Sequence, residues 1–300
     1  MATYQDQASE LRKLMQGMSD TSGASSHDEP AAAAGPRARI MAVTSGKGGV
    51  GKTNLSVNLA VRLATMGRRV VLLDADLGLA NADVLLNLSI RANLAHVIAG
   101  RKNIDQAMVE APGGFTLVPG ASGLAQMANL APDERRRLMA MMRDLATNHD
   151  LVIIDTGAGI GPNVLSFLLA ADELLVVTTP EPTSITDAYA LIKAVARQRE
   201  NIPVSLLVNM VRDRAEGRQV YERINAVCKR FLNMTLSDAG HVVSDARVPQ
   251  GVRRRTPFII DTPDAPASLC IGQLAHKLDR HAAEPRGRGF FRNMASWLGR

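Results

Sequence analysis

A glycine-rich turn between two apolar segments constrains the fold of this chain more than any other feature. The apolar run 40–43 leads into the stretch 44–53, and the amphipathic run 55–63 follows it. Gly46 and Gly51, with Lys-Thr after the second glycine, fit the pattern G-x-x-x-x-G-K-[ST]. Glycines allow backbone N–H groups to turn inward around phosphate oxygens, and the N-terminus of a following helix adds partial positive charge. The sequence therefore predicts a strand, a phosphate-binding loop and a helix, in that order.

Two lysines in this loop are expected to have different roles. Lys52 should reach the β- and γ-phosphates of a nucleotide, and the hydroxyl of Thr53 should help to hold Mg²⁺. Lys47 would be redundant beside Lys52 within one loop, so we expect its side chain to point outward, to the phosphates in a facing subunit. The residues predicted to contact the nucleotide here are Gly46, Lys47, Gly48, Gly49, Val50, Gly51, Lys52, Thr53 and Asn54.

Apolar runs alternate with longer amphipathic runs through the rest of the chain. Strand-like runs occupy 70–73, 151–154, 174–177 and 204–208, and helical patterns occupy 133–148, 184–199, 219–232 and 265–281. This alternation predicts an α/β fold, a doubly wound and mostly parallel sheet with helices on both faces. Apolar residues make up 46% of the chain and aromatic residues only 3%, so the core must be mainly aliphatic.

Acidic residues follow two of the predicted strands, at the edge where such sheets bind ligands. Asp76 is expected to orient or deprotonate an attacking water and to help hold Mg²⁺ through water, and Asp74 is expected to support the same turn. Asp155 is a second candidate for the Mg²⁺ site. The alternative for Asp76 and Asp155 is that each only caps a helix. The predicted catalytic residues are Lys47, Lys52 and Asp76, and the predicted metal-site residues are Thr53, Asp76 and Asp155.

The segment K-G-G-V-G-K-T at 47–53 resembles the deviant Walker A family, which includes MinD, ParA and the flagellar-number regulators. Residues 74–83 are similar to a segment shared by FleN/FlhG and MinD, and Asp155 resembles the Walker B carboxylate. The segment 178–189 is similar to the FleN/FlhG branch specifically. The resemblance implies a slow regulatory ATP hydrolase with ATP and Mg²⁺ as cofactors. It also implies an ATP-dependent homodimer in which Lys47 crosses to the partner's nucleotide.

The same resemblance assigns three further residues to ATP binding. Glu181 resembles a residue that contacts the ribose of the partner subunit's nucleotide, and Asn209 resembles an adenine-reading asparagine. Asp245 belongs to the segment Val243–Asp245, which stands where the family has its adenine loop. Relatives often have proline in place of Val243, so the sequence departs from the family pattern at this position.

The first part of the chain combines a short helical pattern in 1–20 with a Ser-, Gly-, Ala- and Pro-rich linker in 19–38. It is either a docking peptide or a helix folded back on the domain. Residues 6–12 resemble the D-Q-A-x-x-L-R motif with which FleN/FlhG proteins contact the GTPase FlhF. The residues predicted to bind this partner are Asp6, Gln7, Ala8, Leu11 and Arg12.

The last residues carry an apolar helical face flanked by arginines. The residues on this face are Phe290, Phe291, Met294, Trp297 and Leu298. Such a segment is typical of an interfacial membrane helix, and it resembles the C-terminal targeting helix of MinD. The alternative is a helix docked on its own domain. The predicted organisation is therefore a partner-binding peptide and linker in 1–36, an ATPase domain in 37–281 and a membrane-targeting tail in 282–300.

Charge and cysteine content place limits on partners and location. The formal net charge is +6, but the arginine runs 135–137 and 253–255 have no interleaved aromatic residues, so specific nucleic-acid binding is not expected. We interpret the first run as a solvated helix face, and the second as bordering the dimer surface or contacting an acidic partner. Cys228 and Cys270 are interpreted as buried thiols in a reducing compartment. No signal peptide and no apolar run of about 18 residues is present, which favours the cytoplasm.

These observations predict an ATP-dependent dimerising switch that regulates flagellar number or placement. Its expected partners are an FlhF-like GTPase, a flagellar transcription activator and the cytoplasmic face of the inner membrane, with which it would associate reversibly. Two alternatives stay open from the sequence. The chain could be a MinD-type division-site or ParA-type cargo-positioning ATPase, or a mainly non-catalytic scaffold gated by ATP.

Overall fold

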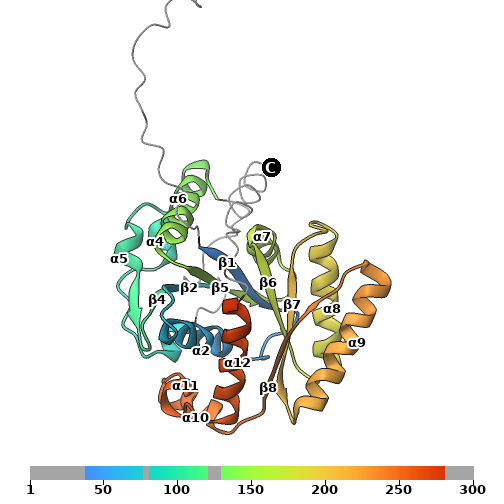
Figure 1. Ribbon diagram of the computed structural model, residues 1–300. Helices are drawn as coiled ribbons and strands as arrows, with labels where there is room; N and C mark the ends of the chain where they lie inside the picture. The colour runs from blue at the N-terminus through green and yellow to red at the C-terminus, as the bar shows by residue number, and fades with distance from the viewer. Residues whose placement is uncertain (1–37, 77–80, 121–129, 281–300) are drawn as a thin grey trace, which may run out of the picture. The chain divides into compact units, whose positions relative to one another are not determined.

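Eight strands form one sheet in the part of the chain that the computed structural model describes, residues 38–76, 81–120 and 130–280 (Figure 1). The strands are β1 (Arg39–Ser45), β2 (Val70–Ala75), β3 (Val109–Ala111), β4 (Phe115–Val118), β5 (Leu151–Ala158), β6 (Glu173–Thr178), β7 (Val204–Val211) and β8 (Ser237–Val243). Their order across the sheet is β3-β4-β2-β5-β1-β6-β7-β8. All neighbouring strands are parallel except β3 and β4. The predicted peptide 1–36 and tail 282–300 lie outside the described residues.

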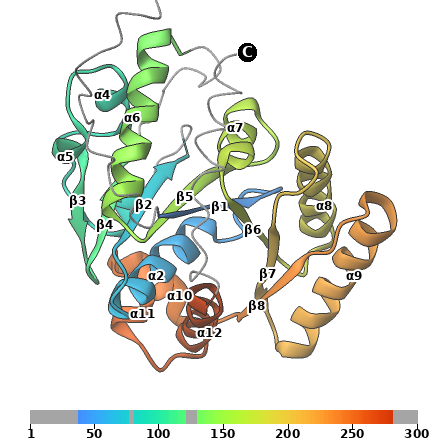
Figure 2. The same ribbon diagram turned by 45° about the horizontal axis from the view of Figure 1, so that its top comes forward.

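Helices cover both faces of this sheet (Figures 1 and 2). They are α2 (Lys52–Thr65), α3 (Ala82–Leu85), α4 (Leu94–Ile98), α5 (Ile104–Ala107), α6 (Pro132–Asn148), α7 (Pro162–Ala170), α8 (Pro182–Ala196), α9 (Arg214–Leu232), α10 (Arg247–Arg254), α11 (Phe258–Asp261) and α12 (Pro266–Arg280). Successive strand side chains point to opposite faces. Met41 and Val43 pack in the cluster with α2, α11 and α12, whereas Ile40 and Ala42 pack in the cluster with α4 and α6–α9. The predicted doubly wound α/β fold is confirmed.

The structure differs from the sequence prediction mainly at the sheet edges and helix ends. Helix α9 begins at Arg214 rather than at residue 219, because the side chain of Asp213 accepts the N–H of Glu216 at 2.9 Å and caps the helix earlier. The hairpin β3–β4 and the edge strand β8 were not predicted, because they are short or polar. No helix in the described ranges is long and apolar enough to cross a membrane.

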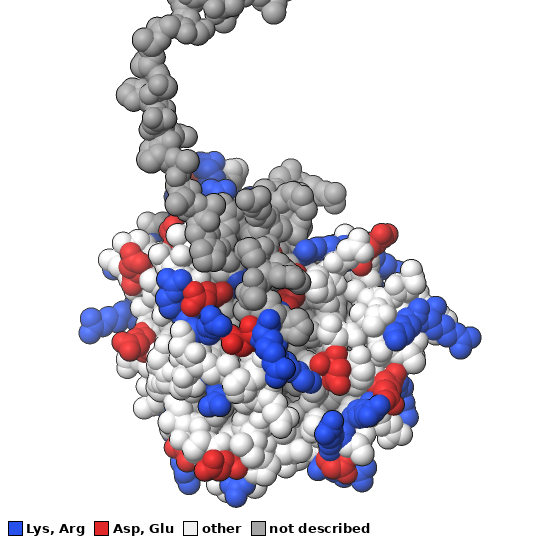
Figure 3. All heavy atoms as spheres, in the orientation of Figure 1, with Lys and Arg blue, Asp and Glu red and all other residues white. Residues whose placement is uncertain are grey.

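Surface charges and cysteines can be compared with the same predictions. Lys and Arg are mixed with Asp and Glu on the face in Figure 3. On α9, for example, Arg218 pairs with Glu222 at 2.8 Å.

Cys228 is buried as predicted, but Cys270 is only partly buried, so the prediction of two buried thiols is wrong for Cys270. Cys270 lies on α12 and packs, partly buried, against the core cluster that this helix shares with α2.

A buried ion pair joins three elements at the start of β1. The guanidinium of Arg39 pairs with the carboxylate of Glu173 on β6, and both side chains are less than one-tenth exposed. Arg39 also donates from Nη1 to the carbonyl of Leu278 on α12 at 2.9 Å. The neighbouring Asp172 accepts the N–H of Ile40 at 3.0 Å. This cluster fixes the central strands β1 and β6 to the last described helix.

Removing one partner of this pair should destabilise the fold strongly. We expect Arg39→Ala to lower the free energy of unfolding by about 3–5 kcal/mol, because the carboxylate of Glu173 would be left buried and unpaired. Urea unfolding followed by circular dichroism measures this difference. The control is Arg68→Ala, which breaks the exposed pair with Asp279 and should cost at most about 1 kcal/mol. Equal losses in the two variants would contradict the role given to Arg39.

Candidate functional site

The glycine-rich turn lies between β1 and α2, as predicted, and its glycines are needed for two different reasons. Gly49 and Gly51 have φ values of 80° and 88°, in the left-handed region that favours glycine. At Gly46 the reason is packing, since a Cβ atom there would lie 2.2 Å from the carbonyl carbon and oxygen of Asp187 on α8. The first glycine of the loop therefore allows α8 to approach the backbone directly.

A cavity of about 1030 Å³ opens beside this turn. It brings together many of the predicted site residues, which are Gly48, Gly49, Gly51, Lys52, Thr53, Asn54, Asp76, Asn209 and Asp245. The other predicted ATP- and metal-site residues, Gly46, Lys47, Val50, Asp155 and Glu181, do not line it. The rest of the lining is mostly apolar and comes mainly from α3, α10 and the ends of β7 and β8.

Lys52 is the buried cation of the cavity. It is the first residue of α2 and is 8% exposed. Burial lowers its pKa, and the nearby carboxylates of Asp155 and Asp76 act in the opposite direction. A buried ammonium group at the start of a helix is well placed to bind a phosphate.

Asp74 supports the turn that follows β2. Its carboxylate accepts three backbone N–H groups, from Asp76, Asn81 and Ala82, each at 3.1 Å. Burial nevertheless raises its pKa to about 6, since desolvation outweighs these hydrogen bonds. The role of turn support that the sequence predicted for Asp74 is therefore seen in the structure.

Asp155 has the chemistry of a magnesium-site carboxylate. It lies opposite Asp74 in the pairing of β5 with β2, and its Oδ1 accepts the hydroxyl of Ser56 at 3.0 Å. Burial, and then repulsion from Asp74, raise its pKa to about 7, although Thr53 and Lys52 favour the charged form. Its Oδ2 is buried and has no hydrogen-bond partner in the described part of the chain. A hydrated Mg²⁺ beside Thr53 would supply that missing partner, so these residues fit the predicted ion.

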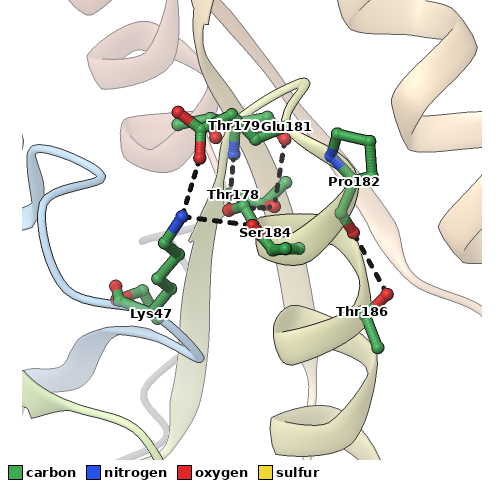
Figure 4. Close-up of polar contacts among 9 residues, drawn as sticks. Lys47, Thr178, Thr179, Glu181, Pro182, Ser184 and Thr186 are labelled. Atoms are coloured by element: carbon green, nitrogen blue, oxygen red, sulfur yellow. Dashed lines mark hydrogen bonds and ion pairs between the residues drawn. The ribbon is translucent and has the colours of Figure 1, made fainter.

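The side chain of Lys47 points away from the cavity and toward the start of α8 (Figure 4). Its Nζ lies 2.8 Å from Oε2 of Glu181 and 3.1 Å from the hydroxyl of Thr183. The start of α8 is itself held by Ser184, whose Oγ accepts the N–H of Thr179 at 3.1 Å. The side chain of Lys47 points out of the cavity, as predicted, and its contact with the phosphates of a facing subunit stays a prediction. Thr183 is a partner that sequence reasoning missed, since nothing in the pattern of 178–189 singles it out.

The two residues predicted to read adenine both make contacts within the chain. Asn209 donates from Nδ2 to the carbonyl of Val50 at 2.8 Å and so holds the phosphate loop. Asp245 accepts the N–H of Arg247 at 3.0 Å and the N–H of Ala267 at 3.3 Å. Asp245 therefore orders the loop after β8, and direct contact of either side chain with a base stays a prediction.

Comparison with known proteins identifies related sequences over most of the chain. The model of a family described as "AAA domain" matches residues 38–208. The antiactivator FleN of Pseudomonas aeruginosa is 45% identical over 83% of this chain and 90% of its own length. The flagellum site-determining protein YlxH of Helicobacter pylori is 35% identical over 87% of the chain and 91% of its own. The septum site-determining protein MinD of Bacillus subtilis is 32% identical over 86% of this chain and 97% of its own length.

Solved structures agree with these relatives. MinD in the MinC:MinD complex of Aquifex aeolicus superposes with a TM-score of 0.68 at 27% identity, over 81% of this chain and 96% of that one. MinD of Pyrococcus horikoshii, complexed with Mg-ADP, superposes with a TM-score of 0.67 at 25% identity, over 82% of this chain and 98% of that one. The bound Mg-ADP of that protein agrees with the ATP and Mg²⁺ predicted here as cofactors. Sequence and fold together show that this chain belongs to the MinD-type family of P-loop ATPases, alongside FleN and YlxH.

Proposed function

We propose that this chain is an ATP-driven dimerising switch that regulates the number or placement of flagella. The regulation of flagella is supported by two relatives, the antiactivator FleN and the flagellum site-determining protein YlxH. The observation that carries the switch is the position of Lys47, which is held outside the nucleotide cavity by Glu181 and Thr183. An ATPase that needed this lysine only for its own phosphates would place it inside the cavity.

In the proposed cycle, ATP binds to the loop 48–54 with its phosphates on Lys52 and the helix N-terminus. The phosphates of a facing copy then compete with the carboxylate of Glu181 for the ammonium of Lys47. Two copies that exchange Lys47 in this way would enclose both nucleotides, and Glu181 would be free to contact the partner's ribose. Asp76, which lines the cavity, would position water for a slow hydrolysis that returns the monomers.

Substitutions of the two lysines of the loop should have different effects if this proposal is right. We expect Lys52→Ala to weaken ATP binding about 100-fold, because it removes a buried, charge-assisted phosphate contact. Lys47→Ala should bind ATP within about threefold of the wild type but stay monomeric. Fluorescent-nucleotide titration measures the first property, and light scattering with ATP and Mg²⁺ measures the second. Dimerisation of Lys47→Ala at wild-type protein concentration would remove the lysine exchange from the cycle.

In this proposal Mg²⁺ would compensate the charge of buried carboxylates as well as position the phosphates. The carboxylates of Asp74 and Asp155 lie side by side, and burial disfavours the charged form of each. Mg²⁺ and the protein carboxylates would neutralise one another once the nucleotide arrives. When bound, the ion would also stabilise charge on the phosphates, and Thr53 and Asp155 are the residues that would hold it.

Neutralising Asp155 should therefore have opposite effects on the empty and the loaded protein. At pH 8 we expect Asp155→Asn to raise the unfolding temperature of the nucleotide-free protein by about 2–4 °C, since a costly buried charge is removed. The same variant should lose the additional stabilisation that Mg²⁺ gives to the ATP complex. Scanning fluorimetry with ATP, with and without Mg²⁺, measures both.

The control for this variant is Asp150→Asn. The hydrogen bond with Arg69 lowers the pKa of Asp150, so the charged form is favoured and its loss should lower the unfolding temperature. A decrease in both variants, with the effect of Mg²⁺ retained in Asp155→Asn, would contradict the role of Asp155.

Partners and location complete the proposal. The peptide 1–36 would contact an FlhF-like GTPase through the residues of 6–12, and a flagellar transcription activator would be a second partner. The tail 282–300 would bind the cytoplasmic face of the inner membrane reversibly, with two tails per dimer acting together. The ATPase domain 37–281 would connect these parts and let ATP control both from the cytoplasm.

The biological role can be tested by deleting the gene and counting flagella by electron microscopy. We expect additional or misplaced flagella with normal division, and restoration by the wild-type gene. A gene carrying Asp76→Ala should not restore the normal number, because the protein would bind ATP and remain dimeric. Minicells with unchanged flagella would instead indicate a division-site ATPase, and full restoration by Asp76→Ala would indicate a scaffold that does not need hydrolysis.

A further inference from the structure

Unusual backbone conformations gather at one end of the nucleotide cavity. Among the described non-glycine residues, four have positive φ, namely Asn87 (52°), Met210 (59°), Asn233 (50°) and Arg255 (54°). Met210 lines the cavity. Arg255 is the C-cap of α10, and Asn87 comes one residue after Leu86, the C-cap of α3; both of these short helices also line the cavity. Such conformations cost free energy and tend to persist where the surrounding structure uses them.

A hydrogen bond connects the ends of these two helices. Nη1 of Arg255 donates to Oδ1 of Asn87 at 3.2 Å. All three arginines of the run 253–255 are exposed, and Arg254 pairs instead with Asp261 at 3.3 Å. Arg255 is therefore the member of the run that bridges the two walls of the cavity.

The walls themselves present apolar side chains that nothing in the described chain covers fully. Val84 on α3, Met210 on β7 and Val252 on α10 are 52%, 47% and 37% exposed, and all three line the cavity. The pairing of β7 with β8 shifts register between Val208 and Val211. This irregularity lets Asn209 turn to the phosphate loop while its neighbour Met210 faces the cavity. A flat aromatic group between these side chains would cover them, and a thioether packs well on such a ring.

We propose that Asn87 and Arg255 form a clasp that positions α3 and α10 on either side of the nucleotide base, with Met210 as the residue on which the base packs. The clasp does not touch the phosphates. It determines how long a nucleotide that carries a base stays bound, and it leaves the binding of the phosphate chain unchanged. Asn87 and Arg255 are thus positioning residues, and Met210 is a base-contacting residue.

Glycine substitutions test the clasp without disturbing the backbone. Asn87→Gly and Arg255→Gly remove the hydrogen-bonding side chains, and glycine accepts the positive φ at both positions. In the full-length protein with Mg²⁺, each variant should release fluorescently labelled ATP about three- to fivefold faster, the effect of losing one solvent-exposed hydrogen bond to a charged group. The double variant should release it no faster than either single variant, because both remove the same bond.

The matched control is Asn233→Gly, which makes the same change at a left-handed residue that ends α9 and does not line the cavity. Its release rate should equal that of the wild type. The proposal is overturned if the clasp variants release labelled ATP within twofold of the wild type, or if their effects multiply in the double variant.

A ligand without a base distinguishes an effect on base binding from damage to the phosphate loop. Inorganic tripolyphosphate with Mg²⁺ occupies only the phosphate end, so displacement of it should be unaffected in Asn87→Gly and Arg255→Gly. Met210→Asn, which also tolerates positive φ, should weaken ATP about tenfold and leave tripolyphosphate unchanged. Equal weakening of ATP and tripolyphosphate in these variants would show damage to the phosphate loop and would refute the base clasp.

Discussion

The phosphate loop of this chain is in direct backbone contact with α8, and much of the site depends on that contact. At Gly46 a Cβ atom would lie 2.2 Å from the backbone of Asp187, so no other residue fits without moving the helix. A second connection joins Lys47 to Glu181 and Thr183 at the start of the same helix. Any change in the loop that accompanies nucleotide binding must therefore be transmitted to α8. The first half of that helix belongs to the segment 178–189, whose sequence resembles the flagellar branch of the family.

The carboxylates beyond β2 and β5 impose the second constraint. Asp74 and Asp155 are both raised in pKa by burial, to about 6 and about 7, from an ordinary value of 3.8. The folded chain therefore holds more protons than the unfolded chain between about pH 4 and 7, and these two groups destabilise the empty protein increasingly as the pH rises through that range. A cation bound beside these carboxylates would favour their charged forms and so remove this destabilisation of the folded chain. Without a bound cation, these two buried carboxylates are electrostatically unfavourable near neutral pH, which favours binding of the cation.

The central part of this architecture could be predicted from the sequence because its strands are covered on both faces. Strands β1, β2, β5, β6 and β7 each contain a mostly apolar run, and the sequence predicts each strand within a few residues. Strand β8 carries Ser237 and Asp238 on the sheet edge, so it has no such run. In the site, the loop residues, Asp76 and Asp155 followed from the motif and the strand ends. The packing reason for Gly46, the contact of Thr183 with Lys47, and the hydrogen bond from Ala267 to Asp245 depend on neighbours far away in sequence.

Helix α3 shows how the carboxylate turn and the base end of the cavity form one unit. It spans only Ala82–Leu85, and a helix of this length is not stable alone, because nucleation is unfavourable. Its preceding residue Asn81 provides no side-chain cap. The N–H groups of Asn81 and Ala82 are bound instead by the carboxylate of Asp74, which acts as a cap from the preceding strand. Its other end is held through Asn87. A shift of Asp74 when the cation binds would therefore move the wall that faces the base, so the two ends of the nucleotide are sensed through one short helix.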